Sequence, residues 1–207
     1  MYLRLIIYVY ILTLLVGCES LLTKDIKPNV KQEWGQMLKK KMEQMHYPFR
    51  IQAKQDRFIG KASKEDWYVK KIGSPKIQIE KKGKQITIYK DRESEVLNEE
   101  QLGIVSPRDH LLLMEEVGEI QHKSVHNISW EKKMARQVRV DIDEKKLSQK
   151  IKKRFSSDQH TQFFPKLSDQ VRVVYHLIYL IDTQTLKQMK IHIQPKNGMK
   201  QEIIYSF

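Results

Sequence analysis

The stretch that decides the fold lies in the last third of the chain, where residues 171–181 read VRVVYHLIYLI. β-Branched and aromatic residues dominate it, and such residues favour strands. From Val174 onward the stretch is apolar on both faces, and a strand of that kind has to be covered on both faces. We therefore expect helices on one side of it, and a second sheet or the hollow interior of a curled sheet on the other.

Two more strands are predicted after this one. Apolar residues alternate at positions 189, 191 and 193, which indicates a strand that is half buried. The run Pro195-Lys196-Asn197-Gly198 predicts a tight hairpin turn, because Asn-Gly accepts the positive φ angles of such turns. Apolar residues at 203, 205 and 207 then predict a third strand at the end of the sequence.

The region before residue 100 predicts one helix and a meander. Apolar residues near the spacing of a helix face precede Pro48: Trp34, Met37, Leu38, Met42 and Met45. From Phe49 the period changes to two, which predicts four antiparallel strands in an unbroken meander. Ile77 and Ile79 are expected to pair with Ile86 and Ile88 across the turn at residues 81–84.

A second helical block is predicted from residue 106. Ser106-Pro107-Arg108-Asp109 supplies a capping hydroxyl, a proline at the first helical position and an acid in the first turn. Residues 136–142 alternate as a strand does. Asp143 is then expected to cap a basic helix that runs to Phe155 and carries the lysines and arginine of 145–154.

The amino terminus predicts export. Residues 5–16 form an apolar run that is too short for a permanent membrane span of about 20 residues. Leu15-Val16-Gly17-Cys18 resembles the bacterial lipobox, whose cysteine is diacylated on sulfur before cleavage. We therefore expect a signal peptide at 1–17, lipidation of Cys18, a tether at 18–30 and a single domain at 31–207. A buried cysteine in an ordinary helix and an uncleaved signal anchor are the alternatives.

The charge of the chain is consistent with a location at a membrane surface. The formal net charge is +13, and Cys18 is the single cysteine. Outside a cell such a charge suits anionic lipid headgroups or phosphate-bearing wall polymers. We expect no nucleic-acid partner, since export and the lack of a recognition motif disfavour it. Lysines that serve only solubility are the other explanation.

The lysine- and isoleucine-rich usage suggests a Gram-positive source, so the expected location is the extracytoplasmic face of the cell membrane.

No enzyme is expected, and neither a cofactor nor a metal is predicted. His122 and His126 stand four apart, but no third ligand lies at a recognisable offset and Asn127-Ile128-Ser129 suggests a loop. Ser106, Asp109 and His110 are triad residue types, yet hydrolase triads draw these groups from separate segments. They fit a helix start better.

The predicted fold class is therefore α+β, a curled antiparallel β-sheet (half-barrel) packed with a few α-helices. This order of elements resembles the LolA/LppX-like lipoprotein-carrier fold over most of residues 31–207. The segments that carry the resemblance are Trp67-Tyr68-Val69, 75–89, 106–112 and 179–187. It implies binding of an acyl chain or lipid, or a role in protein assembly, and no catalytic residues.

The ligand is expected in the hollow of the curled sheet, which alternate residues of two predicted strands would line. Its predicted lining is Val173, Tyr175, Leu177, Tyr179, Met189, Ile191 and Ile193. The alternative function is a non-catalytic envelope assembly or interaction lipoprotein, which docks an anionic partner through the basic helix at 145–154.

Overall fold

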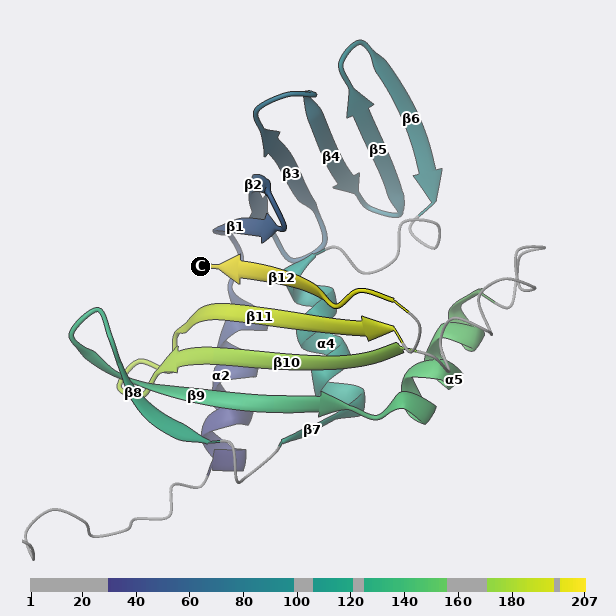
Figure 1. Cartoon of the computed structure of the whole chain (residues 1–207). Coiled ribbons are helices and arrows are strands. Elements are labelled where there is room, and N and C mark those ends of the chain that lie inside the picture. Colours follow the sequence, from purple (N-terminus) through teal and green to yellow (C-terminus); the bar gives the residue numbers. More distant parts are fainter. Residues whose placement is uncertain (1–29, 99–105, 121–124, 156–170, 196–197) are drawn as a thin grey trace, which may run out of the picture.

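The computed structural model describes residues 30–98, 106–120, 125–155, 171–195 and 198–207. Across these ranges one antiparallel sheet of twelve strands runs in the order β6-β5-β4-β3-β2-β1-β12-β11-β10-β9-β7, and β8 pairs with β9 (Figure 1). The helices are α2 (Val30–Glu43), α4 (Pro107–Val117) and α5 (Glu144–Phe155). The strands are β1 (Tyr47–Ala53), β2 (Asp56–Ala62), β3 (Trp67–Ile72), β4 (Ile77–Lys82), β5 (Gln85–Lys90), β6 (Glu93–Asn98), β7 (Gly118–Ile120), β8 (His126–Trp130), β9 (Lys133–Ile142), β10 (Val171–Leu180), β11 (Leu186–Pro195) and β12 (Gln201–Ser206).

The expected α+β class is confirmed, and the antiparallel strands form one large open sheet. Strands β9–β12 lie side by side, whereas β3–β6 are turned steeply away from that direction (Figure 1). The change of direction falls near β1 and β12, which pair with each other. Strands twist relative to their neighbours, and over many strands this twist curves an open sheet.

The carboxyl-terminal strands hold the centre of the core. Strand β10 pairs with β9 on one side and β11 on the other. Its alternate residues Tyr175, Leu177 and Tyr179 are almost fully buried on one face. Helices α2 and α4 lie across that face (Figure 1), and their apolar residues share one hydrophobic cluster with these strands.

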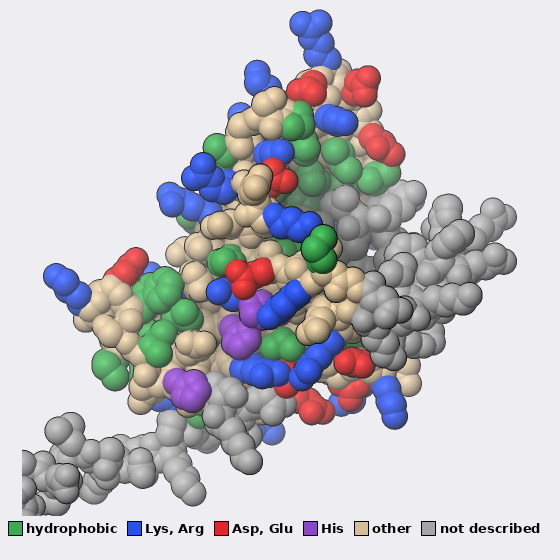
Figure 2. Space-filling model, in the orientation of Figure 1, with side chains coloured by type: hydrophobic (Ala, Val, Ile, Leu, Met, Phe, Trp, Pro, Cys, Tyr) green, Lys and Arg blue, Asp and Glu red, His purple; other side chains and the backbone are tan. Residues whose placement is uncertain are grey.

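The opposite face of β10 has no second sheet over it, because all strands of the described ranges belong to a single sheet. Of the two covers expected for this face, a second sheet is therefore absent from the described residues, and the hollow of a curled sheet stays a prediction. His176 and Ile178 are half buried there, and His176 lies opposite Arg139 and Lys190. Long polar side chains cover apolar surface with their stems while the charged ends stay in water. Figure 2 shows histidine, lysine and arginine side chains gathered over β10 and β11.

Helix α2 confirms most of the predicted apolar stripe. Trp34, Met37 and Leu38 are buried, and Met42 is partly buried against the core. The helix ends at Glu43, before the predicted stripe does. Met45 therefore lies outside the helix and is 63% exposed, so its predicted place in the core is wrong.

Helix α4 begins as its sequence predicts. The Ser106 hydroxyl accepts a hydrogen bond from the Asp109 backbone N–H, and the Asp109 carboxylate accepts one from the Ser106 N–H. This capping box satisfies two backbone donors that the first helical turn leaves without partners. The triad residue types at 106–110 thus serve as a helix start, and His110 points into the core.

The amino-terminal meander has six strands, β1–β6, where the sequence predicts four. The hairpin of β4 and β5 is confirmed, with Ile79 opposite Ile88, while Ile77 faces Lys90 and Ile86 faces Lys81. Strand β6 reads ESEVLN and lacks the expected alternation. In β2, a Cβ atom on Gly60 would lie 2.6 Å from the Phe49 ring, so the glycine allows that ring to pack on the strand.

The region around α5 confirms one prediction and corrects another. Asp143 caps α5, since its carboxylate accepts a hydrogen bond of 2.9 Å from the Lys146 N–H. The side chains of residues 150–155 are not among those described. The loop predicted at Asn127-Ile128-Ser129 is wrong, because these residues belong to β8 and pair with β9. His126 lies in that strand, and His122 lies outside the described residues.

The predicted signal peptide (1–17), Cys18 and the tether (18–30) lie outside the described residues, apart from Val30, which begins α2. Among the described helices, none combines the length and the apolar character that crossing a membrane would need.

Candidate ligand-binding site

The predicted lining residues lie in the packed core. Tyr175, Leu177, Tyr179, Met189 and Ile191 are at most 1% exposed. Val173 and Ile193 are partly buried against them. Side chains of α2 and α4 pack on the same cluster, so a ligand reaches these residues only if a helix moves away from the sheet. Their role as a ligand lining stays a prediction.

A buried polar network ties α4 to the sheet. His110 Nδ1 lies 2.9 Å from the Tyr175 hydroxyl, and Nε2 lies 3.2 Å from the Tyr205 hydroxyl. Burial lowers the pKa of His110 to about 3 and raises the pKa values of both tyrosines. A neutral imidazole donates from one nitrogen and accepts at the other. One tyrosine hydroxyl therefore accepts from His110, and the other donates to it.

A second polar cluster ties α2 to the sheet. The Tyr179 hydroxyl donates to Glu33 Oε2 at 3.2 Å, and Arg136 Nη1 lies 3.0 Å from the same oxygen. The guanidinium is within ion-pair distance, but its Nε and Nη1 atoms have no aligned hydrogen-bond acceptor. Burial, followed by the Glu33 charge, raises the pKa of Tyr179. Both helices are thus held on the sheet by polar contacts within an apolar interior.

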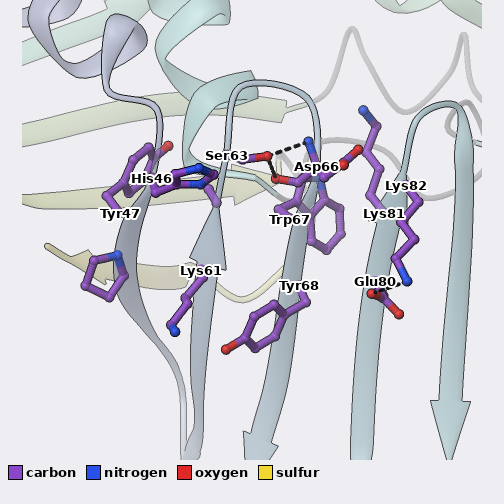
Figure 3. A pocket seen from close by; sticks show the side chains of 12 residues that line it. His46, Tyr47, Lys61, Ser63, Asp66, Trp67, Tyr68, Glu80, Lys81 and Lys82 are labelled. Carbon is purple, nitrogen blue, oxygen red and sulfur yellow. Dashed lines mark hydrogen bonds and ion pairs between the residues drawn. The ribbon is translucent and has the colours of Figure 1, made fainter.

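An open groove lies where β1 and β3 begin and β2 and β4 end. It encloses about 480 Å³, which is within the range of small-molecule sites. Figure 3 shows Tyr47, Trp67 and Tyr68 among the side chains around it. The groove is lined by His46, Tyr47, Pro48, Lys61, Ala62, Ser63, Asp66, Trp67, Tyr68, Glu80, Lys81 and Lys82.

The floor of this groove is part of the hydrophobic core. Tyr47, Ala62 and Trp67 line the groove and also belong to the buried cluster beneath α2 and α4. The pairing registers bring them together, since Ala62 faces Trp67 across β2 and β3, and Tyr47 faces Ala62 across β1 and β2. The core of the molecule therefore meets solvent at this point.

The rim of the groove is polar and internally bonded. The Asp66 carboxylate accepts a hydrogen bond of 2.9 Å from the Gly83 N–H, which joins the two neighbouring hairpin turns. Lys81 Nζ donates to the Glu65 carbonyl at 2.8 Å, and Lys82 pairs with Glu80 at 2.9 Å. Lys61 has no ion pair among the described residues. An apolar floor with cations at its rim suits an amphiphile that has an anionic end.

A buried lysine borders the same region. Lys41 Nζ lies 3.6 Å from the centre of the Tyr47 ring and 4.3 Å from that of Phe207. Burial, with a smaller contribution from Lys187, lowers the pKa of Lys41 to about 8. Burial also raises the pKa of Tyr47 to about 12. The ammonium is held by ring faces, which attract cations.

The groove residues escaped prediction from sequence. In the sequence, Trp67 and Tyr68 indicate a strand and belong to one segment of the family resemblance, but no spacing shows that the ends of the hairpins converge. Among the described residues, no group of three His, Cys, Asp or Glu side chains is placed to hold a metal ion.

The comparisons bear on the fold. No protein-family model matches the chain, and no curated protein matches its sequence. The Mycobacterium tuberculosis lipoprotein LppX is similar in structure, with a TM-score of 0.51 and 9% identity over 84% of this chain and 91% of that one. LprF from Mycobacterium bovis gives a TM-score of 0.51 and 8% identity over 86% and 91%. A LolA superfamily protein from Nitrosomonas europaea gives a TM-score of 0.33 and 10% identity over 84% and 91%.

Two of these three likenesses bear on the fold. The third score is too low to support an argument. The first two show that the chain has a fold like that of the lipoproteins LppX and LprF. At such low identity a shared fold does not carry function with it.

Proposed function

We propose that the chain is a membrane-anchored extracytoplasmic lipoprotein that binds an acyl chain or lipid and catalyses no reaction. Attachment would be through diacylglycerol on Cys18. The observation that carries the binding part is the groove at the ends of β1–β4, whose floor is made of core residues. The anchoring part is supported by the sequence of residues 15–18 and by the fold shared with the lipoprotein LppX.

An apolar chain in the groove would extend the surface of the core. Burial gains about 25 cal/mol per Å², so about 300 Å² of contact gives about 7 kcal/mol before the ligand and side chains are ordered. Lys61 and Lys82 at the rim would face an anionic end of the ligand. Lys82 is already paired with Glu80, which leaves Lys61 as the stronger contact.

The predicted lining in β10 and β11 would form the inner continuation of this site. Tyr47 and Trp67 at the groove belong to the same cluster as Tyr175 and Met189. A longer ligand would reach these residues once α2 or α4 moves away from the sheet. The contacts of His110 and of Glu33 oppose that movement. We therefore propose the groove as the entrance and the core beneath the helices as the inner site.

Binding of a fluorescent fatty acid to the full chain tests this function. Trp67→Leu removes part of the groove floor, so it is expected to weaken binding at least ~10-fold. Trp34→Leu is the matched control, because the two tryptophans are 7% and 8% exposed and both belong to the core cluster. Trp34 does not line the groove, so its replacement is expected to cost stability and to weaken binding far less than Trp67→Leu does.

Native mass spectrometry after mild extraction supplies a second readout. The proposal expects a co-purifying lipid on the wild-type chain and less of it on the Trp67→Leu chain. An absence of both co-purified lipid and fatty-acid uptake would count against the proposal. Equal losses in the two tryptophan variants would place the site elsewhere.

The rival function is an assembly lipoprotein that docks an anionic partner through α5. The helix forms where it was expected, and Lys145 and Lys146 on it are exposed. This function stays a prediction. Charge reversal at Lys150, Lys152 and Lys153 tests it by co-purification, and loss of a partner with retained fatty-acid binding would favour it.

A further inference from the structure

On the face of β1–β3 that points away from the hydrophobic core, nine side chains form a regular array. The pairing registers place them in three rows across the strands. The rows are Pro48–Lys61–Tyr68, Arg50–Ile59–Lys70 and Gln52–Arg57–Ile72. All nine are exposed. We call this set the β1–β3 patch.

The charge of the β1–β3 patch has one sign. It contains four cations, namely Arg50, Arg57, Lys61 and Lys70, and no acid. Within the part of the chain that the structure describes, none of these four forms an ion pair. The nearby acids include Glu80, which pairs with Lys82, and Asp56, which pairs with Lys71. Asp91 and Glu131 lie in the hollows beside the patch. The patch therefore presents uncompensated positive charge to solvent.

Large apolar side chains lie between these cations. Ile59 is 44% exposed, Tyr68 37% and Ile72 50%. Two hollows of about 660 and 720 Å³ flank Ile59, and both include it in their lining. Trp130 and Lys187 also line the hollow of about 660 Å³, and Arg92 lines the hollow of about 720 Å³. Exposed apolar side chains gathered on one face and edged by polar groups are typical of an interaction surface.

We infer that the β1–β3 patch docks on an anionic lipid bilayer. The cations would meet headgroup phosphates, while Ile59 and Ile72 enter the headgroup layer and Tyr68 lies at its level. A polyanion dissolved in water would use the cations but gain nothing from the isoleucines. The interleaving of both kinds of side chain therefore favours a bilayer over a polymer.

The inference rests on one part of the proposed function, the location beside a membrane, and not on the groove ligand. Docking by this face would present the groove close to the bilayer, because Pro48, Lys61 and Tyr68 line the groove as well. A lipid would then pass between membrane and groove over a short path.

A probe on the patch tests the inference in the full chain. Cys18→Ser with Gln52→Cys places a single polarity-sensitive fluorophore within the β1–β3 patch. Cys18→Ser with Lys39→Cys places it on α2 instead. Both chains have the same amino-terminal segment, so any attachment that it provides is the same in both and only the surroundings of the probe differ. The expected result is a blue shift and brightening at position 52 and none at position 39, on phosphatidylcholine vesicles that contain 30% phosphatidylglycerol.

Charge variants then identify the contacts. Arg50→Gln, Arg57→Gln, Lys61→Gln and Lys70→Gln together are expected to reduce the brightening at position 52 at least ~5-fold. The matched control removes four exposed lysines elsewhere, Lys31, Lys39, Lys84 and Lys200, and keeps the response. Ile59→Ser with Ile72→Ser is expected to reduce the brightening at position 52 by about half, and the remaining brightening is expected to stay salt-sensitive.

Three results would overturn the inference. They are an equal response at positions 39 and 52, an equal response on vesicles of phosphatidylcholine alone, and a full response to soluble polyphosphate without vesicles. Trp67→Leu is expected to retain the probe response. If fatty-acid binding fails while the probe responds, the groove proposal falls and the docking surface stands. The reverse outcome removes the docking surface only.

Discussion

Two parts of the same sheet differ in how far helices cover them: β10 and β11 on one side, and β4 and β5 on the other. In β10 and β11, residues on one face are fully buried under α2 and α4. In β4 no residue is buried, and in β5 only Ile86 is. Both halves are rich in isoleucine, so strand propensity does not separate them. The difference teaches that the helices decide where the core lies, and that the amino-terminal meander is free to carry exposed apolar residues for binding.

The largest expected effect contrasts one residue type in the two halves. Ile191 is 1% exposed in β11, and Ile72 is 50% exposed in β3. Ile191→Ala is expected to lower the free energy of unfolding by about 3 kcal/mol, because it leaves a cavity in the core. Ile72→Ala is expected to lower it by less than about 0.5 kcal/mol. Urea unfolding measures both, and similar losses would mean that the face of β3 that carries Ile72 is covered as well.

The next effect is the dependence of the free energy of unfolding on pH, which we assign to His110 in the half of the sheet that the helices cover. Burial holds the pKa of His110 at about 3, whereas an unfolded histidine titrates near its ordinary value of 6.5. Between these values the unfolded chain binds the extra proton, so stability falls as the pH falls. The expected loss is about 2 to 3 kcal/mol between pH 7 and pH 4.5.

His110→Gln supplies the control for this pH dependence. Its amide can still donate to one tyrosine hydroxyl and accept from the other, and it does not titrate. The variant should therefore unfold with a flatter dependence on pH over the same range. An unchanged slope would show that His110 is not the group responsible.

Much of the fold could be predicted from local patterns. Period-two alternation marks β1, β9 and β11, and the Ser-Pro-x-Asp run marks the start of α4. Strand β6 was not predicted, because its apolar residues do not alternate with the acids around them. Strand β8 escaped because Asn127 and Ser129 are typical of loops, and only pairing with β9 makes them a strand. Its stability comes from tertiary pairing rather than propensity.

The candidate site was harder to predict than the fold. The alternation in β10 correctly marks which residues face inward, but it does not tell whether they meet a ligand or a helix. The groove depends on the registers that align Ala62 with Trp67 and Trp67 with Lys81. The contact of β1 with β12 joins segments about 150 residues apart, which no local pattern encodes.

A smaller effect tests how the meander packs. A Cβ atom at Gly60 would lie 2.6 Å from both the Phe49 ring and the Tyr68 carbonyl oxygen. Gly60→Ala is expected to cost about 2 kcal/mol, because the backbone atom cannot move aside as a side chain can. Thermal unfolding measures it, and a neutral result would show that β2 has room to shift against its neighbours.

The smallest expected effect is a gain. Gly35 lies in α2, and a Cβ atom there would meet nothing within 4 Å. Gly35→Ala is expected to raise the free energy of unfolding by about 0.5 to 1 kcal/mol, since alanine loses less conformational entropy in a helix. Chemical unfolding detects this gain. A loss instead would mean that the exposed face of α2 has a further contact.

The most direct test of the binding account is a photoactivatable fatty acid, cross-linked to the full chain and mapped by peptide mass spectrometry. The account predicts cross-links concentrated in peptides that contain residues 46–48 and 61–68, and their loss in Trp67→Leu but not in Trp34→Leu. Cross-links confined to α5, or spread evenly over the surface and unchanged in Trp67→Leu, would contradict it.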